Sequence, residues 1–176
     1  MEKAKLRQEM LQVLRQKAKS LEKTQQEICL QKKLINHPLF KQAQVIGAYL
    51  PSEIECGLDL VFKKIWQQQK KLVAPQAHHK KMHFYPLAET TKRIPSTFGI
   101  LEPEATEEVL KKEIDLLIVP GLIFNATHYR IGFGGGYYDR FLQDFKGETI
   151  SLVFPEQLRD FQPEIFDIPV NQLITL

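Results

Sequence analysis

The sequence IDLLIVPGLIFNATHYRIGFGGGYYDR occupies residues 114–140 and has the order of a strand, a glycine-rich loop and a helix. The apolar run at 114–119 predicts a buried strand, which a Pro-Gly pair ends. The glycines lie at 132–136, and the residues after them predict a helix over 137–145. Open α/β sheets bind ligands in loops at the carboxyl ends of their strands. This stretch therefore predicts an α/β fold with its site in the loop at 120–136.

The glycines of this loop suit an anionic ligand. Glycine adopts positive φ and has no Cβ, so that several backbone N–H groups can converge on one anion. A helix that begins near Tyr137 adds unpaired amides and the positive end of its dipole. A plain tight turn is the alternative, but the flanking strand and helix and the nearby Arg130 favour phosphate binding. The glycines concerned are Gly132, Gly134, Gly135 and Gly136.

The common nucleotide motifs do not fit this loop. No Lys-Ser or Lys-Thr pair follows the glycines, which excludes a Walker A loop. Tyr137 stands where a dinucleotide-binding fingerprint has its third glycine. The loop is therefore a phosphate-binding candidate of another kind.

The rest of the chain predicts helices first and then alternating elements. Apolar residues from Leu6 to Leu21 recur at helical spacing, and the sequence TQQE at 24–27 is typical of a capping box that opens a second helix ending before Pro38. A strand at 45–50, a helix at 58–66 and a strand at 72–75 predict a parallel pair with a right-handed crossover. We expect a single domain over 1–176, with a three-layer, mainly parallel open sheet flanked by helices and an N-terminal helical segment. The remaining expected elements are a polar hairpin at 76–90, a Pro-containing loop up to 104, a short acidic helix near 105–113, and strands at 149–154 and 172–176.

Composition narrows the function classes. The 176 residues carry a formal net charge of +3, with scattered lysine pairs rather than a basic stripe, which suits a small anionic ligand better than nucleic acid. Two cysteines without ligand spacing, Cys29 and Cys56, indicate reduced thiols. No apolar stretch is long enough to cross a membrane. We expect a cytoplasmic monomer without membrane or nucleic-acid partners.

Several dispersed motifs resemble one family. They are VPGLIF at 119–124, RIGFGGGYYD at 130–139, Lys3-x-x-x-Arg7, EIE at 53–55, GILEP at 99–103, FPEQ at 154–157 and the tail at 167–175. In this order they are similar to the 5-formyltetrahydrofolate cyclo-ligases, also called methenyltetrahydrofolate synthetases. The chain departs from that pattern at Asn125 and Asn171, where the family has Asp, and at His128, where it has Gly.

The resemblance implies ATP- and Mg²⁺-dependent cyclisation of 5-formyltetrahydrofolate to 5,10-methenyltetrahydrofolate, through a phosphorylated formyl group, with release of ADP and phosphate. It implies that the folate, which can be polyglutamylated, is the partner. It also assigns roles: Arg130 and Tyr137 are catalytic; Lys3, Arg7, Arg130, Gly132, Phe133, Gly134, Gly135, Gly136 and Tyr138 bind ATP; Leu50, Glu53, Phe133, Gly136 and Tyr137 bind folate; Asp139 and Asp167 bind the metal.

Residue patterns alone leave other interpretations open. Lys3 and Arg7 lie four apart on one helix face, where solvated charge is the default, and Asp139 in a first helical turn commonly just complements the dipole. His78, His79 and His83 lack the partners of a zinc site. The alternatives for the chain are another ATP- or sugar-phosphate-using α/β enzyme that shares the loop, and a basic nucleic-acid-binding module.

Overall fold

A six-stranded sheet forms the centre of the protein. The computed structural model describes residues 2–96, 99 and 101–176, and the strand order within the sheet is β10-β9-β6-β1-β2-β3. Each neighbouring pair from β10 to β2 is parallel, and β3 alone runs antiparallel, to β2. The mainly parallel open sheet predicted from the sequence is confirmed. The strands are β1 (Val45–Ala48), β2 (Lys71–His78), β3 (Lys81–Pro86), β6 (Leu116–Ile118), β9 (Glu148–Leu152) and β10 (Gln172–Ile174).

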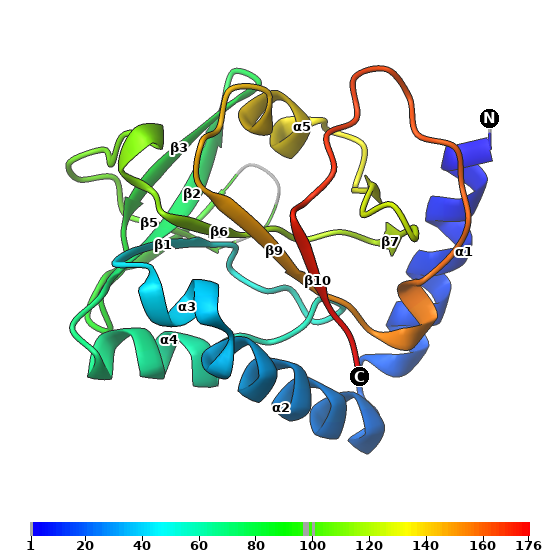
Figure 1. Ribbon diagram of the computed structural model, residues 1–176, viewed down its shortest axis with the longest axis horizontal. Helices are drawn as coiled ribbons and strands as arrows, with labels where there is room; N and C mark the ends of the chain where they lie inside the picture. Colours follow the sequence, from blue (N-terminus) through cyan, green and yellow to red (C-terminus); the bar gives the residue numbers. More distant parts are fainter. Residues whose placement is uncertain (1, 97–98, 100) are drawn as a thin grey trace.

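Helices lie on both faces of the sheet, as Figure 1 shows. Three of them cover one face: α2 (Leu21–Asn36), α3 (Pro38–Gln42) and α4 (Asp59–Gln67). On the other face α5 (Tyr137–Leu142) packs beside β3. The first helix, α1 (Glu2–Lys17), crosses one end of the molecule, and short 3₁₀ turns occur at Lys111–Glu113 and Pro155–Gln157.

The alternation of buried side chains along β6 explains the three layers. Leu116 and Ile118 point into the apolar core shared with α2 and α4, whereas Leu117 points into a second core with Phe84 and Phe141. Side chains alternate between the faces of a strand, so a fully apolar strand is buried on both faces. The apolar side chains of the strand at 114–119 therefore require helices on both faces of the sheet.

The helix boundaries near the N-terminus differ from the prediction. Apolar spacing predicted one helix to Leu21 and a new start at the capping box at 24–27, but α1 ends at Lys17 and α2 begins at Leu21. The Ser20 Oγ accepts a hydrogen bond from the Lys23 N–H at 3.1 Å and caps α2. Ser20 is as good a cap as Thr24 and stands earlier in the chain, so Thr24 lies inside the helix.

Three loop predictions were incomplete. The segment before residue 104 contains a small ladder of β4 (Arg93–Pro95) and β5 (Leu101–Pro103), and the acidic helix expected near 105–113 is only the 3₁₀ turn at its end. The predicted hairpin is present, with β2 extended to His78 because it pairs with β3. An unpredicted hairpin of β7 (Ile123–Phe124) and β8 (Arg130–Ile131) stands between β6 and the glycines.

No helix within the described residues is both long and apolar enough to cross a lipid bilayer.

Candidate active site

A cleft of about 940 Å³ lies at the carboxyl edge of the sheet. Residues just after β1 and β6 line it, which confirms the predicted edge, because parallel strands bring those ends together. Its other walls come from the glycine loop, α1, the β2–β3 hairpin, β5 and the tail before β10. The lining residues include Lys3, Arg7, Leu50, Arg130, Gly132, Phe133, Gly134, Gly135, Gly136, Tyr137, Tyr138, Asp139 and Asp167, together with Tyr49, Ser52, Glu55, Glu102, Arg140, Glu164 and Phe166.

All but one of the sequence-predicted site residues thus meet in this cleft. The exception is Glu53, which is exposed and is not among the lining residues. β1 ends at Ala48, and the chain then turns, with the Glu55 N–H donating to the Ser52 carbonyl at 3.2 Å. This turn separates the two glutamates, so that Glu55 lines the cleft while Glu53 faces solvent.

The glycine loop takes up the left-handed conformations that its composition predicted. Gly134 has φ = +103°, and Gly136, at the start of α5, has φ = +63°. The Arg7 Nε donates to the Gly132 carbonyl at 2.8 Å, which joins α1 to the loop. A β-carbon on Gly134 would lie 3.6 Å from the Arg7 guanidinium carbon, so α1 runs close against the loop. Lys3 and Arg7 therefore share the helix face that borders the cleft.

Arg130 anchors the base of the loop. It is 4% exposed, and its guanidinium donates to the Ile168 carbonyl at 2.6 Å and to the Asp139 Oδ1 at 3.1 Å. Burial lowers the pKa of Arg130, and the Asp139 carboxylate opposes that shift. The side chain remains a cation at neutral pH because the ordinary pKa of arginine is far higher. A permanent positive charge thus lies directly below the glycines.

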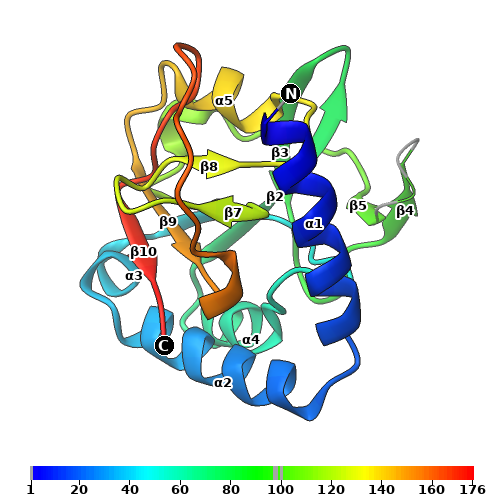
Figure 2. The ribbon, with the colours of Figure 1, turned by 90° about the vertical axis from the view of Figure 1, so that its right-hand side faces the viewer.

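The tail closes the same end of the cleft. In Figure 2 the tail rises from the turn at Pro155–Gln157 past the β7–β8 hairpin to the top of the view and then descends to β10. The Lys3 ammonium donates to the Asp167 carboxylate and lies 3.3 Å from the Glu164 Oε2. The Ile168 N–H donates to the Asp139 Oδ1 at 3.2 Å, which brings the two predicted metal carboxylates to neighbouring positions. The ends of the chain thereby contribute to one charged cluster.

These two carboxylates fit a magnesium ion that arrives with phosphate. Hydrogen bonds within the described residues engage only the Oδ1 of Asp139 and only the Oδ2 of Asp167. The described part of the chain holds no group of three or more His, Cys, Asp or Glu side chains that could bind a metal. Mg²⁺ usually takes one or two protein carboxylates and completes its shell with water and substrate phosphates. The arrangement matches that habit.

The segment after β1 lines another part of the cleft wall. The Glu55 Oε2 accepts hydrogen bonds from the Ser52 N–H at 2.8 Å and the Ser52 Oγ at 2.7 Å. Burial raises the pKa of Glu55, and the two bonds from Ser52 oppose the rise. The Tyr49 hydroxyl donates to the Cys56 carbonyl at 2.9 Å and fixes the start of this segment to its end. Glu55 is therefore a partly desolvated carboxylate on a stiffened loop.

Tyr138 supplies an unpaired polar group to the cleft. Its hydroxyl is buried and has no hydrogen-bond partner among the described residues. Burial and the nearby Glu55 carboxylate raise its pKa, so the hydroxyl stays protonated and can donate. Buried hydroxyls without partners are uncommon in folded proteins.

The positions that depart from the family pattern have clear structural roles. The Asn125 Oδ1 accepts from the Thr127 N–H at 3.1 Å and the Tyr129 N–H at 2.9 Å, as an aspartate would. The Asn125 amide also donates to the Phe161 carbonyl at 3.2 Å, which a carboxylate could not do. His128 has φ = +66°, a conformation that favours glycine, and its ring contacts the Asn171 carbonyl at 3.1 Å. The loop that leads to Arg130 therefore keeps its shape with these residues.

Two of the three histidines of the β2–β3 hairpin have protein partners. The His83 Nδ1 lies 2.7 Å from the Glu108 Oε1, and the His78 Nε2 lies 3.0 Å from the Gln76 Oε1.

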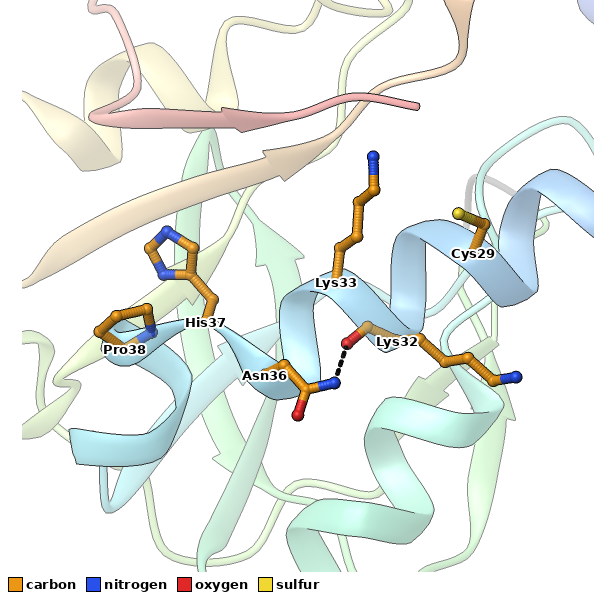
Figure 3. A pocket seen from close by; sticks show the side chains of 6 residues that line it. All are labelled: Cys29, Lys32, Lys33, Asn36, His37 and Pro38. Carbon is orange, nitrogen blue, oxygen red and sulfur yellow. Dashed lines mark hydrogen bonds between the residues drawn. The ribbon is translucent and has the colours of Figure 1, made fainter.

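A second hollow of about 480 Å³ lies on the outside of α2 and shares no residue with the cleft. Figure 3 shows Lys33 pointing towards β10, where its ammonium donates to the Thr175 carbonyl at 2.7 Å, while Lys32 points away. Cys29 at its rim is exposed and unpaired with Cys56, which is buried. The six lining residues are Cys29, Lys32, Lys33, Asn36, His37 and Pro38.

Sequence reasoning missed part of the cleft. Arg140 was inside the most informative motif but was given no role, because its proximity to the hairpin is a tertiary contact. Glu102 lay in the GILEP motif, and its carboxylate accepts from the Ala77 N–H at 3.2 Å. Phe166 and Glu164 carried no pattern at all, since the tail is irregular and is held at the cleft by tertiary contacts with Lys3, Arg130 and Asp139.

Comparison with known proteins identifies the family. A mouse 5-formyltetrahydrofolate cyclo-ligase is 31% identical over 163 residues, which cover 82% of this chain and 80% of that protein. The enzyme of that name from Haemophilus influenzae is 27% identical over 143 residues, 76% of each chain. The NMR structure of 5,10-methenyltetrahydrofolate synthetase from Aquifex aeolicus superposes with a TM-score of 0.85 at 29% identity, covering 99% of this chain and 90% of that one.

The family profile extends over nearly the whole sequence and agrees with the resemblance first noted in the dispersed motifs. It matches residues 1–175, a range that contains the glycine loop, α1 and the tail. These same three segments form walls of the cleft, so the matched region includes them all. The chain belongs to the 5-formyltetrahydrofolate cyclo-ligase family, a family of enzymes.

Proposed function

We propose that the protein catalyses the ATP- and Mg²⁺-dependent closure of 5-formyltetrahydrofolate to 5,10-methenyltetrahydrofolate. Family membership supports the reaction. The observation that carries the site assignment is one cleft that cationic side chains, the glycine loop and the half-buried Glu55 carboxylate line together. Such a cleft can hold a polyphosphate against a neutral ring system.

The chemistry explains why ATP is needed. The formyl oxygen attacks the γ-phosphorus, the bond to ADP breaks, and the formyl carbon becomes an activated iminium centre. N10 then attacks that carbon and loses its proton, and the carbon–oxygen bond breaks to release phosphate. An amide oxygen is a poor leaving group, and phosphorylation makes it a good one. No protein nucleophile is required.

The phosphate end supplies alignment and charge. Phosphoryl transfer depends mainly on positioning and on stabilisation of the phosphate charge. In this proposal Lys3 and Arg7 bind the polyphosphate from α1, and Arg130 lies beneath the transferred group. The amides of the loop complete the cradle, with Phe133 and Tyr138 beside them. Asp139 and Asp167 would hold Mg²⁺, which neutralises part of the phosphate charge when bound.

The folate end supplies orientation. The pterin ring carries amino and N–H donors that pair naturally with a carboxylate. The sequence favoured Glu53 for this role, but Glu53 is exposed and does not line the cleft. Glu55 does line it, and the hydrogen bonds among the described residues use only its Oε2, so its Oε1 is free. We therefore assign pterin binding to Glu55, with Leu50 and Tyr137 packing on the ring.

The test is a spectroscopic assay of methenyltetrahydrofolate formation from 5-formyltetrahydrofolate, with ATP, Mg²⁺ or both omitted. We expect a rise in near-ultraviolet absorbance only when both are present. Lys3→Gln should raise the KM for ATP severalfold, whereas Lys5→Gln, on the exposed side of the same helix, should leave it unchanged. Absence of product from folded protein under full conditions would refute the proposed reaction.

A further inference from the structure

We propose that Arg140 is a positioning residue that holds the second half of the glycine loop, and with it Tyr137, in the shape that binds folate. This inference rests on the proposed function, because it assigns a substrate to that half of the loop. Arg140 is exposed at the cleft and follows directly after the predicted metal ligand Asp139. None of the roles given above involves it.

The Arg140 guanidinium joins two separate segments. Its Nη2 donates to the Gly135 carbonyl at 2.8 Å, and its Nε donates to the Lys80 carbonyl at 2.9 Å. The same group lies over the Tyr137 ring, 5.1 Å from the ring centroid. A planar guanidinium can form several directed bonds and stack on an aromatic face at once, which an ammonium cannot. One side chain therefore ties the loop, the tyrosine and the β2–β3 hairpin together.

The local packing is tight enough for this tie to fix the loop. A β-carbon on Gly136 would lie 2.7 Å from the Arg140 Nη1, and one on Gly135 would lie 2.8 Å from the Tyr137 ring. The Tyr137 ring is thus packed against the backbone of Gly135 while Arg140 covers it. Loss of Arg140 would remove the hydrogen bond to the Gly135 carbonyl and the cation that covers the Tyr137 ring.

The first half of the loop has its own arginine. Arg7 donates a hydrogen bond to the Gly132 carbonyl, just as Arg140 donates one to the Gly135 carbonyl. Each arginine withdraws one carbonyl from the cleft and neutralises its partial negative charge, which leaves the loop amides to face an anion. Arg7 lies on α1 with Lys3, whose ammonium bonds Asp167, whereas Arg140 bonds the β2–β3 hairpin. The two halves are therefore set by different elements.

The hairpin side of the contact shows an independent sign of constraint. The turn between β2 and β3 consists of His79 and Lys80, with φ = +46° and +64°, and neither is a glycine. Two-residue turns of this kind strongly prefer Asn-Gly. Strained backbone persists where surrounding contacts fix it, and such positions concentrate at functional sites. The carbonyl that Arg140 uses belongs to one of these two residues.

The first arm of the test needs no substrate. Amide hydrogen exchange over residues 132–138 is measured on the ligand-free protein for wild type, Arg140→Lys, Arg140→Gln and the control Lys81→Gln. Lys81 is exposed and lies on the same hairpin. Its substitution by glutamine removes one positive charge, as Arg140→Gln does. We expect amide exchange over this segment to become at least fivefold faster in both Arg140 variants. Exchange over the same segment in Lys81→Gln, and over the central strands in every variant, should match wild type.

The second arm measures steady-state kinetics. We expect Arg140→Lys to raise the KM for 5-formyltetrahydrofolate at least fivefold and the KM for ATP by a smaller factor, because the amides of this half of the loop also take part in the proposed ATP cradle. Arg7→Lys should do the reverse. An inactive wild-type protein would refute the proposed function, while the exchange arm would still decide whether Arg140 holds the loop. Unchanged loop exchange in Arg140→Gln, or equal effects of Arg140→Lys on both KM values, would overturn the assignment.

Discussion

Arg130 and Asp139 are partners within the site before any ligand arrives. The guanidinium is almost fully enclosed, while the carboxylate remains partly exposed, and both hold the backbone of Ile168. A buried cation is tolerated only with such partners. The residue that we propose for phosphate binding therefore also holds the tail in place.

Arg130→Ala should reduce stability as well as turnover. The change leaves the Ile168 carbonyl unpaired and opens a space where a long side chain was packed. We expect a loss of about 3 kcal/mol in the free energy of unfolding, measured by urea denaturation. Asp139→Asn keeps the shape of the side chain and should lower kcat with a much smaller stability loss. Equal stability of wild type and Arg130→Ala would contradict this account.

Glu55→Gln should separate binding from stability. Burial raises the pKa of this carboxyl above its ordinary 4.5, so the folded state binds more protons than the unfolded state between about pH 4.5 and the raised pKa. Wild-type stability therefore falls as pH rises through that window and then levels off, whereas glutamine does not titrate. Thermal melts from pH 4 to 7 should show the variant gaining relative to wild type. Its KM for folate should rise about tenfold, and Glu53→Gln should match wild type.

The two glutamates also show which features of single residues the sequence could not predict. The presence of Arg130, the glycines and both aspartates in the cleft could be predicted because the loop motif and the tail motif carry them. Which of Glu53 and Glu55 faces the cleft depended on a turn at 52–55 that strand alternation could not reveal. The partnership of Lys3 with Asp167 spans 164 positions and leaves no local pattern.

At the scale of elements, the β2–β3 hairpin combines a strained turn with a contact to the site. Replacing Lys80 by Gly removes the Cβ conflict at φ = +64° and keeps the backbone carbonyl. We expect about 1 kcal/mol of added stability, equivalent to roughly 2–4 °C in Tm for a chain of this size. Calorimetry should record it. Lys81→Gly, one residue later in regular strand, should instead lower Tm, and a fall in both would show that the turn is not strained.

Elements were predicted well where their sequence pattern is strong. The parallel strands and α4 came from apolar runs and helical spacing, and both survive in the structure. The β7–β8 hairpin was missed because its strands have two residues each and lack alternation. The start of α2 was predicted wrongly because both Ser20 and Thr24 can cap a helix. The hydrogen bond from the Lys23 N–H to the Ser20 Oγ shows that Ser20 is the cap.

At the scale of the whole molecule, ligand binding should tighten segments that are distant in sequence. MgATP is expected to engage α1, the glycine loop and the tail together. A ligand at about 100 times its Kd adds about 2.7 kcal/mol to the free energy of unfolding. Thermal melts should therefore shift upward by several degrees with MgATP and by less with ATP plus a chelator. Lack of any shift at saturating MgATP would contradict the combined site.

The ion pair between Lys3 and Asp167 has a consequence for biosynthesis. One partner leaves the ribosome 164 positions ahead of the other. Domains fold during synthesis from the N-terminal side, so Lys3 on α1 must wait for this partner until the tail has emerged. A nucleotide at the proposed site therefore cannot act as a folding aid for a growing chain that ends before Asp167, because the cradle is then still incomplete.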